Sequence, residues 1–206
     1  MQILSLRRSF DADHSSSSYE FFALKALTAE QRAAVQRLTG ESAGRHLSFH
    51  YQGDWQDIPS GWADKLLTSG YDILVSESYD WWNVDLSLPH DPALLARLKP
   101  FECEADGNGF GVRVVGERMV LGFGMQLDYS AVYDAFGENP FRGLANLFKA
   151  VRTELLAGDL SAARAMYETY GSAEDEEGEE DEEGEPEGVE TISASGETLL
   201  SIMERY

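Results

Sequence analysis

Residues 81–88 read WWNVDLSL, and from the second tryptophan onward they alternate apolar with polar side chains. Successive side chains of a strand point to opposite faces, so this period of two predicts a β-strand with one buried and one polar face. The apolar stretch 72–76 precedes it, and together the two predict a β-hairpin whose turn lies at residues 78–80. This hairpin favours an antiparallel sheet.

Further strands are predicted on both sides of this hairpin. The segment YEFFALK from Tyr19 is rich in aromatic residues, and residues 46–52 alternate polar and apolar side chains. Glycine-rich turns separate three more short apolar runs, which we expect to be strands at residues 101–104, 111–115 and 118–127.

Capping signals locate the helices between and after the strands. The capping box Thr28-Ala-Glu-Gln31 opens a helix that Gly40 ends, and Asp91-Pro92 opens another that finishes before Pro100. We also expect a short helix from Ser60 to Gly70, a long one from Asn139-Pro140 with one apolar stripe, and a last one capped by Asp159. The sequence therefore predicts an α+β fold, with a mostly antiparallel sheet and a C-terminal helical hairpin packed on it.

The charge of the chain is concentrated near its end. The formal net charge is −21, but residues 174–190 alone hold twelve of the 37 acidic side chains. Such a like-charged block predicts a flexible linker, because it has too few apolar side chains to bury. We therefore expect an α+β domain at 1–171, an acidic linker at 172–196 and a short amphipathic helix at 197–206.

Composition narrows the classes of function. The single cysteine, Cys103, excludes an internal disulfide framework and a thiolate zinc cluster built by this chain alone, which favours a reducing compartment. No apolar run reaches membrane-spanning length, and no cluster of Lys and Arg extends beyond Arg7-Arg8. We expect a cytoplasmic protein with no membrane association, no direct nucleic-acid binding and no cofactor.

The polar sides of two predicted strands form the first candidate site. His46, Ser48 and His50 alternate on one strand, and Trp81, Asn83, Asp85 and Ser87 alternate on another. If the strands are neighbours, these side chains share one surface, and a tryptophan beside histidine and carboxylate suits a peptide or small-molecule site. The alternative is the solvent face of an antiparallel sheet, which accounts for every one of these residues except Trp81.

Two apparent metal motifs fail on geometry. His46 and His50 lie four residues apart on a predicted strand, about 13 Å at ~3.3 Å per residue, so one ion cannot bridge them. Glu104, Asp106, Asn108 and Gly109 resemble the start of a calcium loop, but Val115 stands where a bidentate glutamate is required. We predict a hairpin turn there and no metal site.

The end of the chain forms the second candidate site. Apolar residues return after the acidic block, at Leu199, Leu200, Ile202, Met203 and Tyr206. A helix of about ten residues is marginal alone, so it needs a surface on which to dock. That surface belongs either to a partner, as in helix-in-groove recognition, or to the chain's own domain.

One short stretch carries a resemblance. Residues 19–23 (YEFFA) followed by 27–32 (LTAEQR) resemble the opening of a group of uncharacterised bacterial proteins, some of them associated with SWIM-type zinc fingers. The C-x-C and C-x-H ligands of that finger are absent, so neither a metal nor a nucleic-acid role is implied. The resemblance implies a bacterial cytosolic protein.

Three functions remain in competition. The first is a non-catalytic protein-interaction module or accessory subunit, because no catalytic signature accompanies Trp81 and the terminal segment. The second is a small hydrolase or other enzyme that uses His46 or His50 with Asp85, which requires these groups to converge. The third is an acidic inhibitor of a basic nucleic-acid-binding protein.

Overall fold

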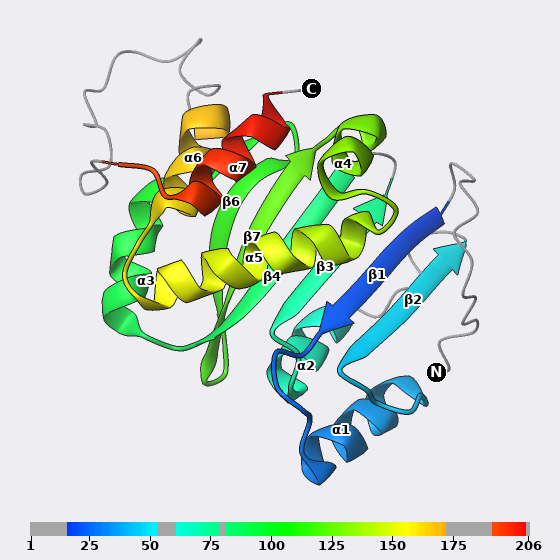
Figure 1. Cartoon of the computed structure of the whole chain (residues 1–206). Coiled ribbons are helices and arrows are strands. Elements are labelled where there is room, and N and C mark those ends of the chain that lie inside the picture. The colour runs from blue at the N-terminus through cyan, green and yellow to red at the C-terminus, as the bar shows by residue number, and fades with distance from the viewer. Residues whose placement is uncertain (1–15, 53–60, 79–80, 172–190, 205–206) are drawn as a thin grey trace.

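The computed structural model describes residues 16–52, 61–78, 81–171 and 191–204 (Figure 1). Within them the chain forms an α+β fold around one seven-stranded sheet in the order β2-β1-β3-β4-β7-β6-β5, with every neighbouring pair antiparallel. The strands are β1 (Ser16–Phe22), β2 (His46–Gln52), β3 (Ile73–Ser78), β4 (Trp81–Pro89), β5 (Cys103–Ala105), β6 (Asn108–Val115) and β7 (Arg118–Gln126).

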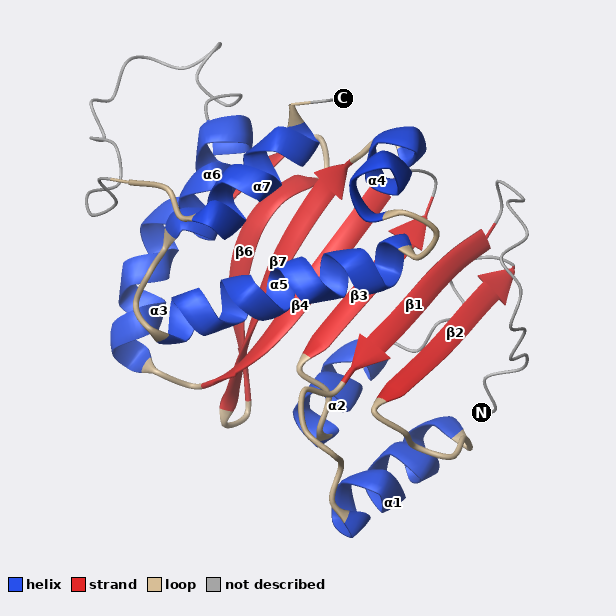
Figure 2. Ribbon diagram, in the orientation of Figure 1, coloured by secondary structure: helices blue, strands red, loops and turns tan. Residues whose placement is uncertain are grey.

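The helices of the described residues divide between the two faces of the sheet. They are α1 (Ala29–Thr39), α2 (Trp62–Ser69), α3 (Pro92–Leu98), α4 (Tyr129–Phe136), α5 (Pro140–Leu156), α6 (Ser161–Tyr170) and α7 (Ala194–Met203), with a 3-10 turn η2 (Lys99–Phe101) after α3. In Figure 2 the long helix α5 crosses the sheet in front of β3 and β4, and α6 and α7 lie above it, while no helix stands in front of β1 and β2. None of these helices is long and apolar enough to cross a membrane.

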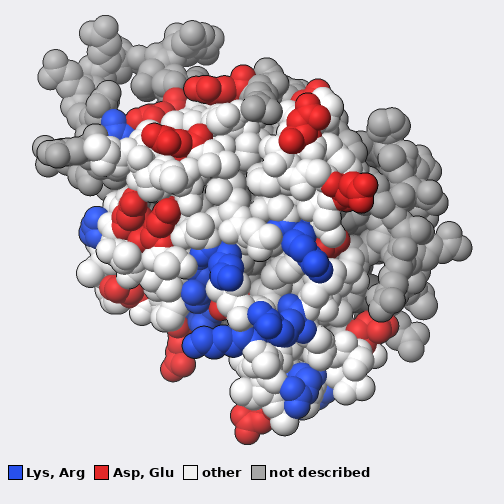
Figure 3. Space-filling view, in the orientation of Figure 1, with Lys and Arg blue, Asp and Glu red and all other residues white. Residues whose placement is uncertain are grey.

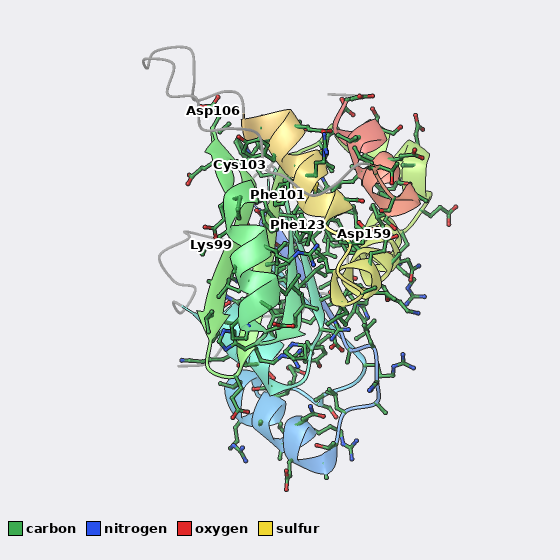
Figure 4. The ribbon with its side chains drawn as sticks, turned by 90° about the vertical axis from the view of Figure 1, so that its left-hand side faces the viewer. Lys99, Phe101, Cys103, Asp106, Phe123 and Asp159 are labelled. Atoms are coloured by element: carbon green, nitrogen blue, oxygen red, sulfur yellow. The ribbon has the colours of Figure 1, made fainter. Side chains whose placement is uncertain are left out.

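The larger core lies between β3–β7 and helices α3 to α7. Trp82, Val84 and Leu86 of β4 are fully buried against it, because alternation turns every second residue of the strand toward the helices. The apolar stripe of α5 supplies the opposite side of this core. In Figure 4, which shows the sheet from the side, α5, α6 and α7 stand together on one side of it.

A smaller core lies on the other face, at the β1–β2–β3 end. Phe21 and Phe49 pack there with Trp62 at ring-centroid distances of 5.3 to 6.1 Å. Helix α2 contributes the fully buried Leu67, and α1 contributes Val35. Helices α3 to α7 therefore pack on one face of the sheet, whereas α2 on the other face contacts β3, β4 and β7.

Most of the predicted elements are confirmed. The Thr28 side chain accepts from the N–H of Gln31 while the Gln31 side chain accepts from the N–H of Thr28, which completes the predicted capping box. Gly40 ends α1 in the left-handed conformation. The α5–α6 hairpin also lies where Asn139-Pro140 and Asp159 predict it, since Asp159 accepts from the N–H of Ser161.

Two helix starts need correction, and one helix was not predicted. Helix α2 begins after Gly61, so Gly61 and not Ser60 is its N-cap. Helix α4, whose first turn is capped by the Asp128 carboxylate, is the helix that was not predicted from the sequence. Helix α7 begins at Ala194 rather than Glu197, because the Ser193 hydroxyl accepts from the N–H of Gly196 and caps it earlier.

Candidate functional site

The face of β4, β7 and β6 that points away from α5 carries polar residues and glycines. Register across the strands places Asn83 beside Gly124 and Gly109, and Asp85 beside Gly122 and Gly111. Paired residues of an antiparallel sheet project to the same side, so these rows form one surface. We call it the glycine face, and it consists of Trp81, Asn83, Asp85, Gly109, Gly111, Arg113, Gly122 and Gly124.

Two of its glycines make room for polar side chains of β4. A Cβ atom on Gly124 would lie 3.1 Å from Asn83 Oδ1, and one on Gly122 would lie 3.3 Å from Asp85 Oδ1. Gly109 has φ +139°, and a Cβ atom there would meet the Cys103 carbonyl oxygen at 2.0 Å. Gly111 differs from all three, because a Cβ atom there would have no other atom within 4 Å, and its φ is not in the left-handed region.

An ion-pair network links the glycine face to α2. Arg113 donates to Asp85 at 3.0 Å and, through a second nitrogen, to Asp64 at 2.7 Å. Burial raises the pKa of Asp85, and the nearby Arg113 guanidinium only partly offsets this effect. Burial lowers the pKa of Arg113, but hydrogen bonds and attraction from both carboxylates outweigh burial and hold it above its usual range.

Trp81 lies at the end of the glycine face, beside the β5–β6 hairpin. Its side chain is only partly buried, and its ring comes within 3.0 Å of the position that a Cβ atom on Gly107 would occupy. Asp106 and Gly107 form the turn of that hairpin, with φ values of +50° and +81°. Asp106 is at the upper left of Figure 4. The prediction of a hairpin turn in place of a calcium loop is thereby confirmed.

The oxygen atoms of the apparent calcium loop also point apart. Glu104 pairs with Gly109 on one face, whereas Asn108 pairs with Ala105 and is buried on the helix side of the sheet. In the part of the chain that the structure describes, no group of three or more His, Cys, Asp or Glu side chains is arranged to hold a metal ion.

The two polar strands are not neighbours, so the condition for a shared polar surface is not met. β1 and β3 separate β2 from β4, and the registers place His50 in one row with Ser18, Glu77 and Trp82, on the helix side. Asp85 lies in a row with Leu74, on the opposite face. His46 and His50 therefore cannot converge with Asp85, and the enzyme hypothesis that required this convergence fails.

The two histidines instead belong to a separate polar surface on β1 and β2. His46 Nε2 lies 2.8 Å from Glu20 Oε2, and its ring stacks on Phe22 at 4.9 Å. His50 Nδ1 lies 3.0 Å from the Ser18 hydroxyl. One ring nitrogen of each histidine therefore has its partner within the β1–β2 pair.

The terminal helix packs on its own domain. Leu199, Ile202 and Met203 are buried in the larger core, and Leu200 is partly buried against it. Ser193 donates to Glu154 of α5 at 2.9 Å and thereby fixes the start of α7. The candidate docking residues thus have an intramolecular site, while Tyr206 and the acidic residues 172–190 lie outside the described residues.

Comparison of the chain with protein-family models, curated proteins and solved structures found no significant match in any of the three. The resemblance of residues 19–32 to an uncharacterised bacterial group therefore stays a prediction.

Sequence reasoning missed the residues that give the glycine face its character. The tripeptide Gly-Phe-Gly occurs twice, at 109–111 and at 122–124. The two copies pair in register, so that Phe110 and Phe123 meet in the core at 5.0 Å while the glycines share the opposite face. This repeat was a signal in the sequence, because glycine at every second strand position marks one face without side chains.

Proposed function

We propose that this chain is a non-catalytic protein-interaction module of a bacterial cytoplasmic assembly, and that it binds its partner through the glycine face. The observation that supports this most is Gly111, which shares one sheet surface with Trp81, Asn83 and Asp85. Helix α2 borders this surface through Asp64, which pairs with Arg113. Glycine in a strand interior weakens the strand and often marks a place where another molecule approaches the backbone closely. Among the described residues, no atom gives a steric reason for glycine at position 111.

Trp81 supplies the second element of a binding surface. A partly exposed tryptophan offers a large apolar area together with an N–H donor, and tryptophan is enriched among residues that dominate binding energies. The ring belongs to the same surface as the glycines, two of which lie under the side chains of Asn83 and Asp85. A polypeptide segment can lie across the glycines and place one side chain against the ring.

The charges around this surface favour a basic partner. Asp64, Asp85 and Glu104 surround it, and Arg113 is the cation that the structure places among them. The chain as a whole has a formal charge of −21. Opposite charge on a partner accelerates association and selects against acidic competitors, so we expect a basic polypeptide segment as the occupant.

Matched substitutions on the two faces of β6 test this proposal. Gly111→Arg places a bulky cation on the glycine face, where the space is open. Val114→Arg places the same cation on the opposite side of the same strand, at a side chain that is 47% exposed. Wild type, both variants and Trp81→Ala are immobilised and exposed to extract of cells that produce the protein, and retained proteins are identified by mass spectrometry.

We expect one basic protein to be retained by wild type and Val114→Arg and lost by Gly111→Arg and Trp81→Ala. Binding of that protein, once purified, should weaken as the salt concentration rises. If the Gly111→Arg and Val114→Arg variants retain the same proteins, the glycine face is not the binding surface and the proposal is wrong.

A further inference from the structure

Three arginines lie at the end of the sheet opposite to Trp81. Arg118 begins β7, Arg152 comes from α5, and Arg45 precedes β2. Arg118 and Arg152 both donate to the backbone carbonyl of Ser87, at 3.1 and 3.3 Å. Arg45 donates to the Leu24 carbonyl at 3.1 Å. We call these three residues the arginine cluster.

A single carboxylate, Asp72, pairs with two of the three guanidinium groups. Asp72 accepts from the N–H of Leu24 at 2.8 Å, which connects it to the residue that Arg45 binds. Its other oxygen lies 3.3 Å from Arg152 and 3.8 Å from Arg118, and the second distance is beyond a hydrogen bond. Among the described residues no further Asp or Glu forms an ion pair with the cluster, so positive charge is in excess.

The surroundings of Arg118 disfavour its positive charge. Burial lowers the pKa of Arg118, and repulsion from Arg152 adds to that effect, while attraction by Asp72 opposes it. Arginine is otherwise the side chain that holds its charge most firmly. The environment of Arg118 is therefore one in which an additional negative charge would be stabilised.

The cluster stands out against the rest of the molecule. In Figure 3 the Lys and Arg side chains gather in the middle of this face, below and beside α5, and most Asp and Glu side chains lie nearer its margin. Backbone carbonyl oxygens accept hydrogen bonds from one edge of each guanidinium group. An uncharged donor could bond these carbonyls equally well, so capping alone does not require arginine. Capping does not explain why Arg118 and Arg152 share one carboxylate in a chain of net charge −21.

We propose that the arginine cluster binds the phosphate group of a small phosphorylated ligand. A guanidinium group presents its N–H donors as a planar fork that fits two oxygens of a phosphate at once, which an ammonium group cannot do. Arg118 and Arg152 share Asp72, and Arg45 is linked to Asp72 through the backbone of Leu24, so we assign a small anion to the cluster. A surface for duplex nucleic acid would need a longer basic stripe. This site is independent of the glycine face and of the function proposed for it.

The test is a titration of the full-length protein with pyrophosphate, inorganic phosphate and, as a carboxylate of similar charge, citrate, at constant ionic strength. Binding is followed by calorimetry and by the NMR signals of the arginine Nε–H groups. We expect saturable binding of pyrophosphate that shifts arginine Nε–H signals. Charged hydrogen bonds of this kind are worth ~1.5–3 kcal/mol, so Arg45→Gln and Arg118→Gln should each weaken binding by about tenfold or more.

Arg164→Gln is the matched control, because Arg164 is an arginine of α6 paired with Glu168 and lies outside the cluster. It should bind pyrophosphate as wild type does. Arg45 is exposed, so Arg45→Gln remains informative even if Arg118→Gln fails to fold. Absence of saturable binding to wild type, or equal affinity of the Arg45→Gln and Arg164→Gln variants, overturns the proposal. Citrate binding as tight as pyrophosphate binding overturns the assignment to phosphate.

Discussion

One face of the sheet is built in two different ways at its two ends. At the β1–β2–β3 end it carries Phe21, Phe49 and Leu74, and α2 covers them. At the β4–β7–β6 end the same face carries Asn83, Asp85 and glycines, and α2 borders it through Asp64, which pairs with Arg113. Both ends show the period-two alternation of a strand. Alternation therefore determines which residues share a face, but the chemistry of the residues on that face determines whether a helix covers it.

The two ends also differ in what holds their side chains. In the aromatic half, edge-to-face contacts join Phe21 and Phe49 to Trp62, and such pairs add to the free energy gained from burial. In the glycine half, polar side chains of β4 lie over glycines and bond to Arg113. We infer that the aromatic half contributes mainly to stability and that the glycine half is free to bind.

Replacement of Phe21 by alanine should have the largest effect. Phe21 is fully buried and packs on Phe49, Trp62 and Tyr71. Loss of a buried phenyl ring costs about 3–5 kcal/mol in the free energy of unfolding. Asn83→Ala, the control on the glycine face, should change it by no more than ~0.5 kcal/mol. Urea denaturation measures the free energy of unfolding of both variants. Similar losses would contradict the inference that the aromatic half contributes more to stability than the glycine half.

Replacement of Leu199 tests how much the packing of α7 on the larger core contributes to stability. Leu199 is fully buried in the larger core, so Leu199→Ala should lower the free energy of unfolding by about 2–5 kcal/mol. The control is Leu156→Ala, because that leucine is 50% exposed at the end of α5. If Leu199→Ala is as stable as the control in urea denaturation, α7 does not hold its docked position in solution.

Much of the fold is predictable because its signals are local. The capping box at Thr28 and the apolar stripe of α5 each depend on residues within a few turns of one another. The sheet order is not predictable in the same way, since β1 pairs with β3 across a segment that includes β2 and two helices. Such long-range pairing depends on which strands bury each other's faces.

The candidate site is less predictable for the same reason. Alternation identifies Trp81, Asn83 and Asp85, which do share one surface. It also favours His46 and His50 on that surface, but their face depends on the register of two intervening strands. The arginine cluster joins residues 45, 118 and 152 through Asp72, Ser87 and the backbone of residue 24, and no spacing in the sequence brings them together.

Tyr71 gives a smaller effect that depends on pH. Burial raises the pKa of Tyr71 to about 12, and its hydroxyl donates to the Gly44 carbonyl at 3.0 Å. Tyr71→Phe should cost about 1 kcal/mol below pH 10, because the hydrogen bond is lost. Between pH 10 and 12 the unfolded wild-type chain releases this proton while the folded chain keeps it, so wild-type stability falls as pH rises.

The Tyr71→Phe variant has no phenolic hydroxyl to ionise, so its free energy of unfolding should fall less steeply between pH 10 and 12. Urea denaturation at pH 8, 10 and 11 measures the difference between the two proteins. A constant difference from pH 8 to pH 11 would show that Tyr71 is not protected from ionisation in the aromatic half.

Alanine at Gly111 should have the smallest effect and the opposite sign. Gly111 has open space at its Cβ position and no left-handed φ, so alanine should raise the free energy of unfolding by about 0.4–1 kcal/mol by restricting the unfolded chain. Gly124→Ala is the contrast, because its Cβ would press on Asn83 Oδ1 at 3.1 Å and on the Gly107 carbonyl oxygen at 3.2 Å, and should be destabilising. Urea denaturation of the two variants measures both changes.

A gain at Gly111 means that the fold does not need glycine there, which leaves close approach by a partner as the reason for it. A loss would mean that the sheet itself requires this glycine, and the strongest support for binding at the glycine face would be gone.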